Sequence, residues 1–123
     1  MSRHYPALLD LRDTPVLVVG GGAVAARRVA GLVDADARPV VIAPEVESRL
    51  DAQIARSGLT LHRREYRSGD AAGYRVVMAV TDRREVNALV ARDAAATGAW
   101  VSVVDDPETS TFQVPAMVRA GEV

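Results

Sequence analysis

Two adjacent carboxylates, Asp105 and Asp106, stand between a short apolar run and Pro107. Because neighbouring carboxylates repel each other, their pairing needs an explanation. A turn is one, since Asp before Pro is common in turns. Alternatively, a strand presents Asp105 to a reaction as a general acid or base, because burial beside a second carboxyl favours the protonated form. The residues leave both interpretations open for Asp105 and favour the turn for Asp106.

A second set of residues has the spacing of a phosphate-binding loop. Gly20, Gly22 and Ala25 match G-x-G-x-x-G/A directly after an apolar run. In such a loop Gly20 permits a tight turn, Gly22 lets the backbone approach a pyrophosphate, and Ala25 keeps the helix close to the sheet. The free N–H groups at the helix start favour phosphate charge. The pattern predicts a dinucleotide site; a plain strand-to-helix turn is the alternative.

The end of the second predicted strand departs from the usual dinucleotide pattern. An Asp or Glu commonly binds the adenine ribose there, whereas Ala43 and Pro44 hold that place and Glu45 follows. We predict that Glu45, or backbone groups at Pro44, contact the ribose hydroxyls. An acid near a helix start is the alternative explanation for Glu45. No arginine stands at the strand tip for a 2′-phosphate, although Arg27 and Arg28 lie in the preceding helix, so the sequence favours NAD over NADP.

A third polar segment, containing Thr81 and Asp82, follows another apolar run. Both residue types cap helices well, because their side-chain oxygens accept hydrogen bonds from free N–H groups. The same turn would also lie beside the nicotinamide end of a bound cofactor. Asn87, in the helix that follows, could face either way.

Hydrophobic spacing predicts the elements that position these residues. Apolar runs predict strands at 15–19, 38–44, 74–82 and 99–106, and partial alternation predicts an edge strand at 59–66. Helical spacing predicts helices within 20–37, 45–58 and 83–98. This order predicts an α/β fold: a doubly wound parallel sheet of about five strands with helices on both faces. Asp105 is expected at the tip of a central strand.

Composition narrows the function classes. The chain has 123 residues, 49% of them hydrophobic and 25% charged, and a net charge of −1, so we expect no nucleic-acid partner. All fifteen basic residues are arginine, which either codon usage or a polyanionic ligand would explain. There is no cysteine, no signal-peptide pattern and no run of membrane-spanning length, so we predict a cytoplasmic protein with no membrane partner. His4 and His62 do not suggest a metal site, and we predict none.

In its motifs the chain resembles the precorrin-2 dehydrogenase domain of siroheme synthases. The resemblance extends from Tyr5 to Gly121 and is carried in order by YPALLDLRDTPVLVVGGGAVAARRV, VVIAPE, AVTDRREVN and VSVVDDPETSTFQVPAMVRAG. It implies a single Rossmann-like NAD-binding domain over residues 1–123. It also implies NAD-dependent oxidation of a tetrapyrrole, precorrin-2, to sirohydrochlorin, with ferrous-iron insertion in some members.

The resemblance also assigns roles to residues. The aspartate that closes the fifth strand is the catalytic group, matched here by Asp105. The family's cofactor contacts correspond to Gly20, Gly22, Ala23, Val24, Pro44, Glu45, Thr81 and Asp82. Ser102 stands where the family usually has Asn. Family members continue past MVRAGEV into a further strand and a helical dimerisation domain, so homodimer formation stays open.

A second functional interpretation is a regulatory NAD-sensing module of the potassium-transport type. Such modules share the glycine turn and a TD…EVN segment. They usually carry Asp at the end of the second strand, which IAPE lacks, and they do not explain VVDDPETSTF. The sequence therefore favours the dehydrogenase over the sensor.

Overall fold

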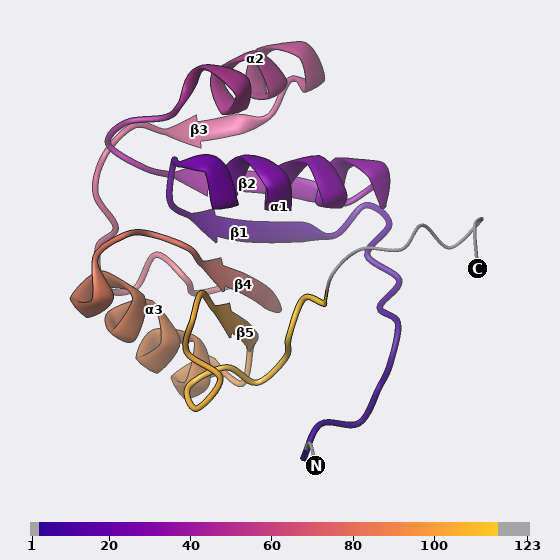
Figure 1. Cartoon of the computed structure of the whole chain (residues 1–123), viewed down its shortest axis with the longest axis vertical. Helices are drawn as coiled ribbons and strands as arrows, with labels where there is room; N and C mark the ends of the chain where they lie inside the picture. Colours follow the sequence, from indigo (N-terminus) through magenta and orange to yellow (C-terminus); the bar gives the residue numbers. More distant parts are fainter. Residues whose placement is uncertain (1–2, 116–123) are drawn as a thin grey trace.

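A computed structural model describes residues 3–115, and its five strands form one parallel sheet (Figure 1). The elements are β1 (Pro15–Val19), α1 (Ala23–Asp34), β2 (Arg38–Ile42), α2 (Ser48–Ser57), β3 (Thr60–His62), β4 (Val76–Ala79), α3 (Arg84–Thr97) and β5 (Trp100–Val103). The strand order is β3-β2-β1-β4-β5 with every pairing parallel. The predicted doubly wound α/β fold is confirmed.

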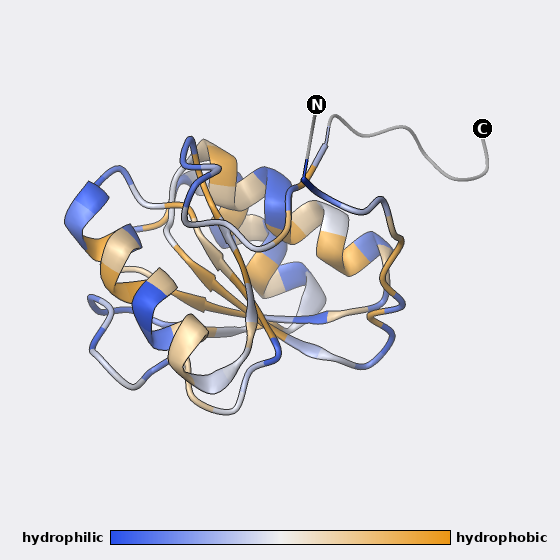
Figure 2. Cartoon of the chain, turned by 90° about the horizontal axis from the view of Figure 1, so that it is seen from below, coloured by the Kyte–Doolittle hydropathy of each residue, from blue (hydrophilic) through white to orange (hydrophobic). Residues whose placement is uncertain are grey.

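Alternating side chains of the strands build two cores, one on each face of the sheet. Val16 and Val18 of β1 are fully buried against α1 and α2. Leu17 and Val19 face the other way, toward α3. In Figure 2 the strands are largely orange, between helices that carry blue segments on their outer sides. The continuous apolar run of β1 is therefore explained by burial on both faces of a parallel sheet.

Several boundaries differ from the prediction: the second, fourth and fifth strands end at Ile42, Ala79 and Val103 instead of 44, 82 and 106. The second helix begins at Ser48 rather than at Glu45, because the Glu47 N–H donates to the Gly21 carbonyl oxygen at 2.8 Å and holds this segment against the glycine loop. The third strand ends at His62 rather than reaching residue 66, and it pairs only with β2, as expected for an edge strand. The second and third helices end at Gly58 and Gly98, both in the left-handed conformation, as predicted.

The position expected for Asp105 is wrong in one respect, because β5 is an edge strand and not a central one. Its outer side is covered by the segment that follows it. The N–H groups of Val101 and Val103 donate to the hydroxyl oxygens of Thr111 and Ser110 at 2.8 and 2.9 Å. These hydroxyls satisfy donors that would otherwise be open to pairing with another strand.

The connection from β3 to β4 is anchored to α3 by one carboxylate. Asp93 accepts hydrogen bonds from the Tyr66 hydroxyl at 2.7 Å, the Gly69 N–H at 3.1 Å and the Ser68 hydroxyl at 3.3 Å. The hydrogen bond from Tyr66, with smaller help from Gly69 and Ser68, lowers the pKa of Asp93 below its usual value. Of the three helices described, none is long and apolar enough to cross a membrane.

Asp93 makes the stability of this connection dependent on pH. A carboxyl whose pKa is lower in the folded state stabilises the fold above its unfolded pKa, near 4, and this stabilisation is lost as the pH falls through the lower folded value. Asp93→Asn should therefore lose less stability than wild type as the pH falls below about 4. Urea unfolding across that range measures the difference. Parallel pH profiles of the two proteins would contradict the assignment.

Gly21 provides a sharper test of the fold. A Cβ at Gly21 would collide with the Glu45 carbonyl oxygen, so Gly21→Ala should lower the free energy of unfolding by about 1–3 kcal/mol. Gly31→Ala is the matched control, because a Cβ there meets no atom within 4 Å. Since Ala is the better helix former, this change in α1 should raise stability by about 0.5–1 kcal/mol. Equal stability of the two variants would refute the contact.

Candidate functional site

The predicted site segments follow the carboxyl ends of four adjacent strands of the sheet. Val19 of β1 is in register with Ile42 of β2 and Ala79 of β4, and Ala79 is in register with Val103 of β5. Two positions beyond these four residues stand, in spatial order across the sheet, Pro44, Gly21, Thr81 and Asp105. At about 4.8 Å per strand, the four strand ends that these residues follow span roughly 14 Å. Ligands of open parallel sheets bind at this edge.

Backbone contacts at its first two glycines hold the glycine loop in place. Gly20 has a φ of +141°, and a Cβ there would lie 2.7 Å from the Val80 carbonyl oxygen, so the tight turn requires glycine. Gly21 packs directly on the Glu45 backbone. The end of β1 is therefore fixed to both neighbouring strand ends.

Gly22 differs from these two glycines, because a Cβ there meets nothing within 4 Å. Packing within the protein therefore does not account for the absence of a side chain at this exposed position. A ligand whose phosphate approaches the backbone would account for it. Ala23 is exposed and Val24 half-buried at the start of the helix, beside this open space.

The electrostatics of the α1 N-terminus also suit an anion. Gly22 is the N-cap and supplies no side-chain hydrogen bond. Among the three described helices, α1 alone has no acidic residue in its first turn; α2 has Asp51 and α3 has Glu85. The first turn of α1 therefore supplies no carboxylate of its own to the positive end of the helix dipole, which fits a bound pyrophosphate.

The segment after β2 is acidic and exposed. Pro44 and Glu45 are both exposed at the strand end, and Glu45 precedes α2 instead of lying in its first turn. The helix-start explanation for Glu45 is therefore wrong, and Glu47 is the N-cap.

The two arginines of α1 differ in exposure. Arg27 is exposed, whereas burial of Arg28, together with repulsion from Arg27, lowers the pKa of Arg28.

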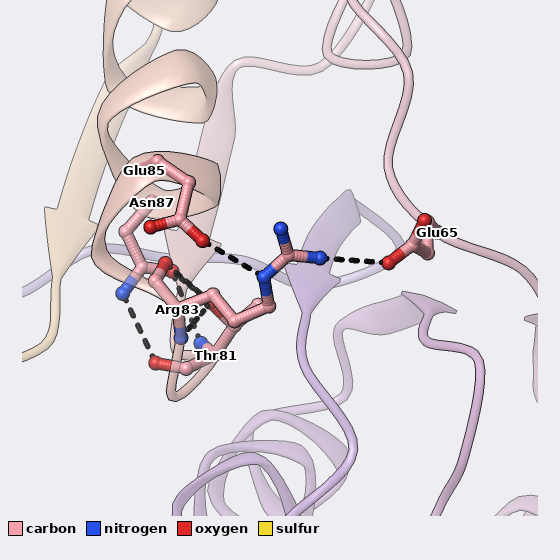
Figure 3. A network of polar contacts seen from close by, with 5 residues as sticks. All are labelled: Glu65, Thr81, Arg83, Glu85 and Asn87. Atoms are coloured by element: carbon pink, nitrogen blue, oxygen red, sulfur yellow. Dashed lines mark hydrogen bonds and ion pairs between the residues drawn. The ribbon is translucent and has the colours of Figure 1, made fainter.

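The turn after β4 is closed on itself by Asn87 (Figure 3). The Asn87 Oδ1 accepts from the Thr81 N–H at 3.1 Å and from the Thr81 hydroxyl at 2.7 Å, and Nδ2 donates to the Thr81 carbonyl oxygen at 3.0 Å. The Arg83 N–H donates to the Thr81 hydroxyl oxygen at 3.1 Å. The N-cap of α3 is Arg83, so Thr81 builds the turn before the helix rather than capping it directly.

Asp82 is the outward-facing member of this turn and is exposed. Beside it Arg83 bridges two carboxylates: its Nε donates to Glu85 at 2.8 Å, and its Nη1 donates to Glu65 at 2.8 Å. Figure 3 shows this guanidinium reaching from the start of α3 to the separate segment that carries Glu65. Because all three side chains are exposed, these ion pairs contribute little to stability and are available for exchange with a ligand carboxylate.

Asp105 lies in a turn in which the Asp106 N–H donates to the Val103 carbonyl oxygen at 3.2 Å. Its φ is +57°, a conformation that Asp and Asn tolerate better than most residues. Its side chain is exposed, so the prediction that the Asp105 carboxyl is buried is wrong. Asp106 accepts from the Thr109 N–H at 3.4 Å, which supports its predicted role in the turn. Both aspartates thus shape the turn, and Asp105 also presents a carboxylate.

A hollow of about 640 Å³ opens at the opposite, amino edge of β1, β2 and β3. Two arginines on its rim already have partners within the chain: Arg12 pairs with Asp10 at 2.7 Å, and the Arg38 Nε donates to the Asp13 carbonyl oxygen at 3.0 Å. The carboxyl edge combines an uncapped helix start with exposed carboxylates. We therefore place the candidate site at the carboxyl edge. No cluster of three or more His, Cys, Asp or Glu side chains that could hold a metal occurs in residues 3–115.

Sequence reasoning missed two residues that shape the site. The G-x-G-x-x-G/A pattern assigns no role to Gly21, although a run of three glycines is a signal of more than one close backbone contact. Helical spacing alone does not show whether the Asn87 amide faces the sheet or solvent, so the sequence leaves its direction open. It is 6% exposed and faces Thr81.

Comparisons with known proteins agree with this geometry. A family model described as "Putative NAD(P)-binding" matches residues 7–116. The siroheme synthase of Methylococcus capsulatus is 40% identical over 120 residues, covering 98% of this chain and 25% of that protein. The siroheme synthase of Ectopseudomonas mendocina is 42% identical over 116 residues, covering 94% and 25%. The chain thus spans about a quarter of the length of these curated relatives.

A solved structure, "SirC, precorrin-2 dehydrogenase", matches with a TM-score of 0.85 and 28% identity, covering 98% of this chain and 59% of that chain. The likeness therefore includes the whole sheet and its carboxyl edge. Because the family model matches nearly the whole chain, and because the glycine loop and the bare α1 start are those of a phosphate-binding edge, the chain belongs to the NAD(P)-binding family that this model describes.

Proposed function

We propose that this chain is the NAD-binding, catalytic part of a precorrin-2 dehydrogenase, which oxidises precorrin-2 to sirohydrochlorin. The row of Pro44, Gly21, Thr81 and Asp105 along one edge carries the proposal, since it aligns the predicted cofactor segments with the predicted catalytic carboxylate. The siroheme synthase relatives and the SirC structure support the choice of substrate.

The residues of the edge would divide the work along the cofactor. Pro44 and Glu45 would hold the adenosine ribose, and the acidic character of this segment favours NAD over the more negative NADP. Gly20, Gly22, Ala23 and Val24 would cradle the pyrophosphate at the start of α1. Thr81 and Asp82 would flank the nicotinamide. When bound, NAD supplies the hydride acceptor, and the protein supplies the positioning.

Asp105 would act as a general base or stabilise positive charge on the substrate. Oxidation of precorrin-2 removes a hydride and a proton, and the carboxylate of Asp105 can accept that proton or stabilise the cation that forms as the hydride leaves. Precorrin-2 itself carries eight carboxylates. The Arg83 guanidinium, held only by exposed carboxylates, is a candidate for one of them. Cytoplasmic location, homodimer formation and the lack of nucleic-acid, membrane and metal partners stay predictions.

Gly22→Asp separates cofactor binding from stability. An aspartate at the N-cap should stabilise α1 by about 0.3–1 kcal/mol, because it would cap free N–H groups and oppose the helix dipole. The same charge should weaken NAD binding at least about tenfold by repelling the pyrophosphate. Calorimetric titration with NAD and thermal unfolding measure the two effects. If the variant is more stable and still binds NAD as tightly as wild type, the pyrophosphate does not bind at this loop.

Asp105→Asn tests the catalytic role without straining the turn, since Asn tolerates the positive φ at this position. We expect turnover of precorrin-2 to fall about a hundredfold or more, with NAD affinity unchanged. Asp106→Asn, which removes the same charge one residue away, is the control and should keep most activity. Absorbance of sirohydrochlorin and of NADH reports turnover. Wild-type chain that binds NAD without converting precorrin-2 would favour the regulatory module instead.

A further inference from the structure

Asn87 is a buried amide whose side-chain hydrogen bonds, within the described residues, all join Thr81. It lies in the first turn of α3 and is 6% exposed. Its three side-chain hydrogen bonds all join Thr81: two are accepted, from the Thr81 N–H and hydroxyl, and one is donated to the Thr81 carbonyl. The amide thus holds both backbone polar groups of Thr81 (Figure 3).

These contacts leave Thr81 little to offer a ligand. Its N–H and carbonyl are occupied by Asn87, and its hydroxyl oxygen already accepts from the Arg83 N–H. The single hydroxyl proton goes to the Asn87 Oδ1 at 2.7 Å or to the Arg83 carbonyl oxygen at 3.0 Å. Thr81 therefore fixes the shape of the turn, while Asp82 remains exposed on it.

An apolar side chain would suit the position of Asn87 better if packing were its task. The neighbouring buried positions of α3 are Val90, Ala91 and Ala94. Burial of an amide is unfavourable unless it is hydrogen-bonded, and Asn is a poorer helix former than Ala. The gain that offsets these costs is the placement of the turn after β4, two positions beyond the register of Val19 and Ala79, beside the glycine loop.

We propose that Asn87 is a positioning residue for the nicotinamide half of the cofactor. It touches the turn and not the ligand, and it sets where Thr81 and Asp82 stand relative to the glycine loop. The inference rests on the proposed function, because it takes the turn as the place of the nicotinamide. An amide is required, since an ionised carboxylate cannot donate to the Thr81 carbonyl oxygen and would repel it.

Two ligands separate this role from a general effect on folding. NAD carries the nicotinamide, whereas ADP-ribose retains the adenosine and pyrophosphate groups and lacks it. Asn87→Ala should weaken NAD binding about tenfold, as expected for loss of a buried hydrogen-bonding group. ADP-ribose binding should change less than about twofold. Burial should raise the pKa of an aspartate at this position, which is 6% exposed. Asn87→Asp should therefore weaken NAD binding at neutral pH and recover part of it near pH 5, as the carboxyl gains a proton and can again donate.

The charged groups near this position are Asp82, Arg83 and Glu85 on the turn and α3, and Glu65 on the segment after β3. Wild type titrated over the same pH range therefore corrects for their ionisation. Val90→Ala is the matched control for stability, because Val90 is fully buried in α3 and has no part in the turn. It should lower the thermal midpoint without changing the ratio of the two dissociation constants.

Isothermal titration of each variant, below its unfolding temperature, decides between the outcomes. A rise in the NAD dissociation constant alone supports the positioning role. An equal change for NAD and ADP-ribose, or no change for either, overturns it. Failure of wild type to bind both ligands would refute the proposed function instead, so the two failures are distinguishable.

Discussion

The arrangement of the carboxyl edge depends on a steric constraint at the glycine loop. Gly20 and Gly21 approach the backbone of Val80 and Glu45 so closely that neither could carry a Cβ in the present geometry. These contacts fasten the end of β1 to the chain beyond β4 on one side and beyond β2 on the other. Because β1 lies between those two strands, the loop takes its position from both neighbours, and α1 begins where the loop releases the chain.

The start of α1, directly after this loop, carries no capping side chain and no acidic residue in its first turn. Gly22 leaves open space, and no acidic side chain enters the first helical turn. The two other helices carry an acid at the equivalent place, which lowers the positive potential at their starts. The difference is one of local charge and bulk rather than of fold. It concentrates the capacity to bind an anion at one point of the edge.

In the outer part of the edge, side chains make the hydrogen bonds to backbone groups that a neighbouring strand would make. The Asn87 amide pairs with both the N–H and the carbonyl of Thr81, as a neighbouring strand would. Ser110 and Thr111 hydroxyls accept from β5 where a sixth strand would otherwise pair. In both places a polar side chain satisfies backbone groups at the end or margin of the sheet. The Ser110 hydroxyl also donates to the Asp106 carbonyl oxygen at 2.8 Å, within the turn that carries Asp105.

Local patterns in the sequence were sufficient for the elements and their order, because buried parallel strands are continuously apolar and amphipathic helices repeat every 3.6 residues. The glycine spacing likewise predicted the tight turn between β1 and α1, since its requirements are met by adjacent residues. Boundaries were less certain where a distant contact decides them. The second helix starts at Ser48 because Glu47 is held by Gly21, a residue 26 positions earlier in the chain.

Which strands are internal, and which side chains meet, was decided only by the tertiary structure. Apolar spacing does not distinguish a covered edge strand from a central one, so the sequence predicts β5 inside the sheet. In the structure β5 is an edge strand, and the segment with Ser110 and Thr111 covers it. The direction of Asn87 depends on how α3 packs beneath β4. The sequence by itself determined the class of fold and the residues of the edge, because these follow from local chemistry. The alignment of Pro44, Gly21, Thr81 and Asp105 in one row required the strand register, which arises from pairing between segments far apart in the chain.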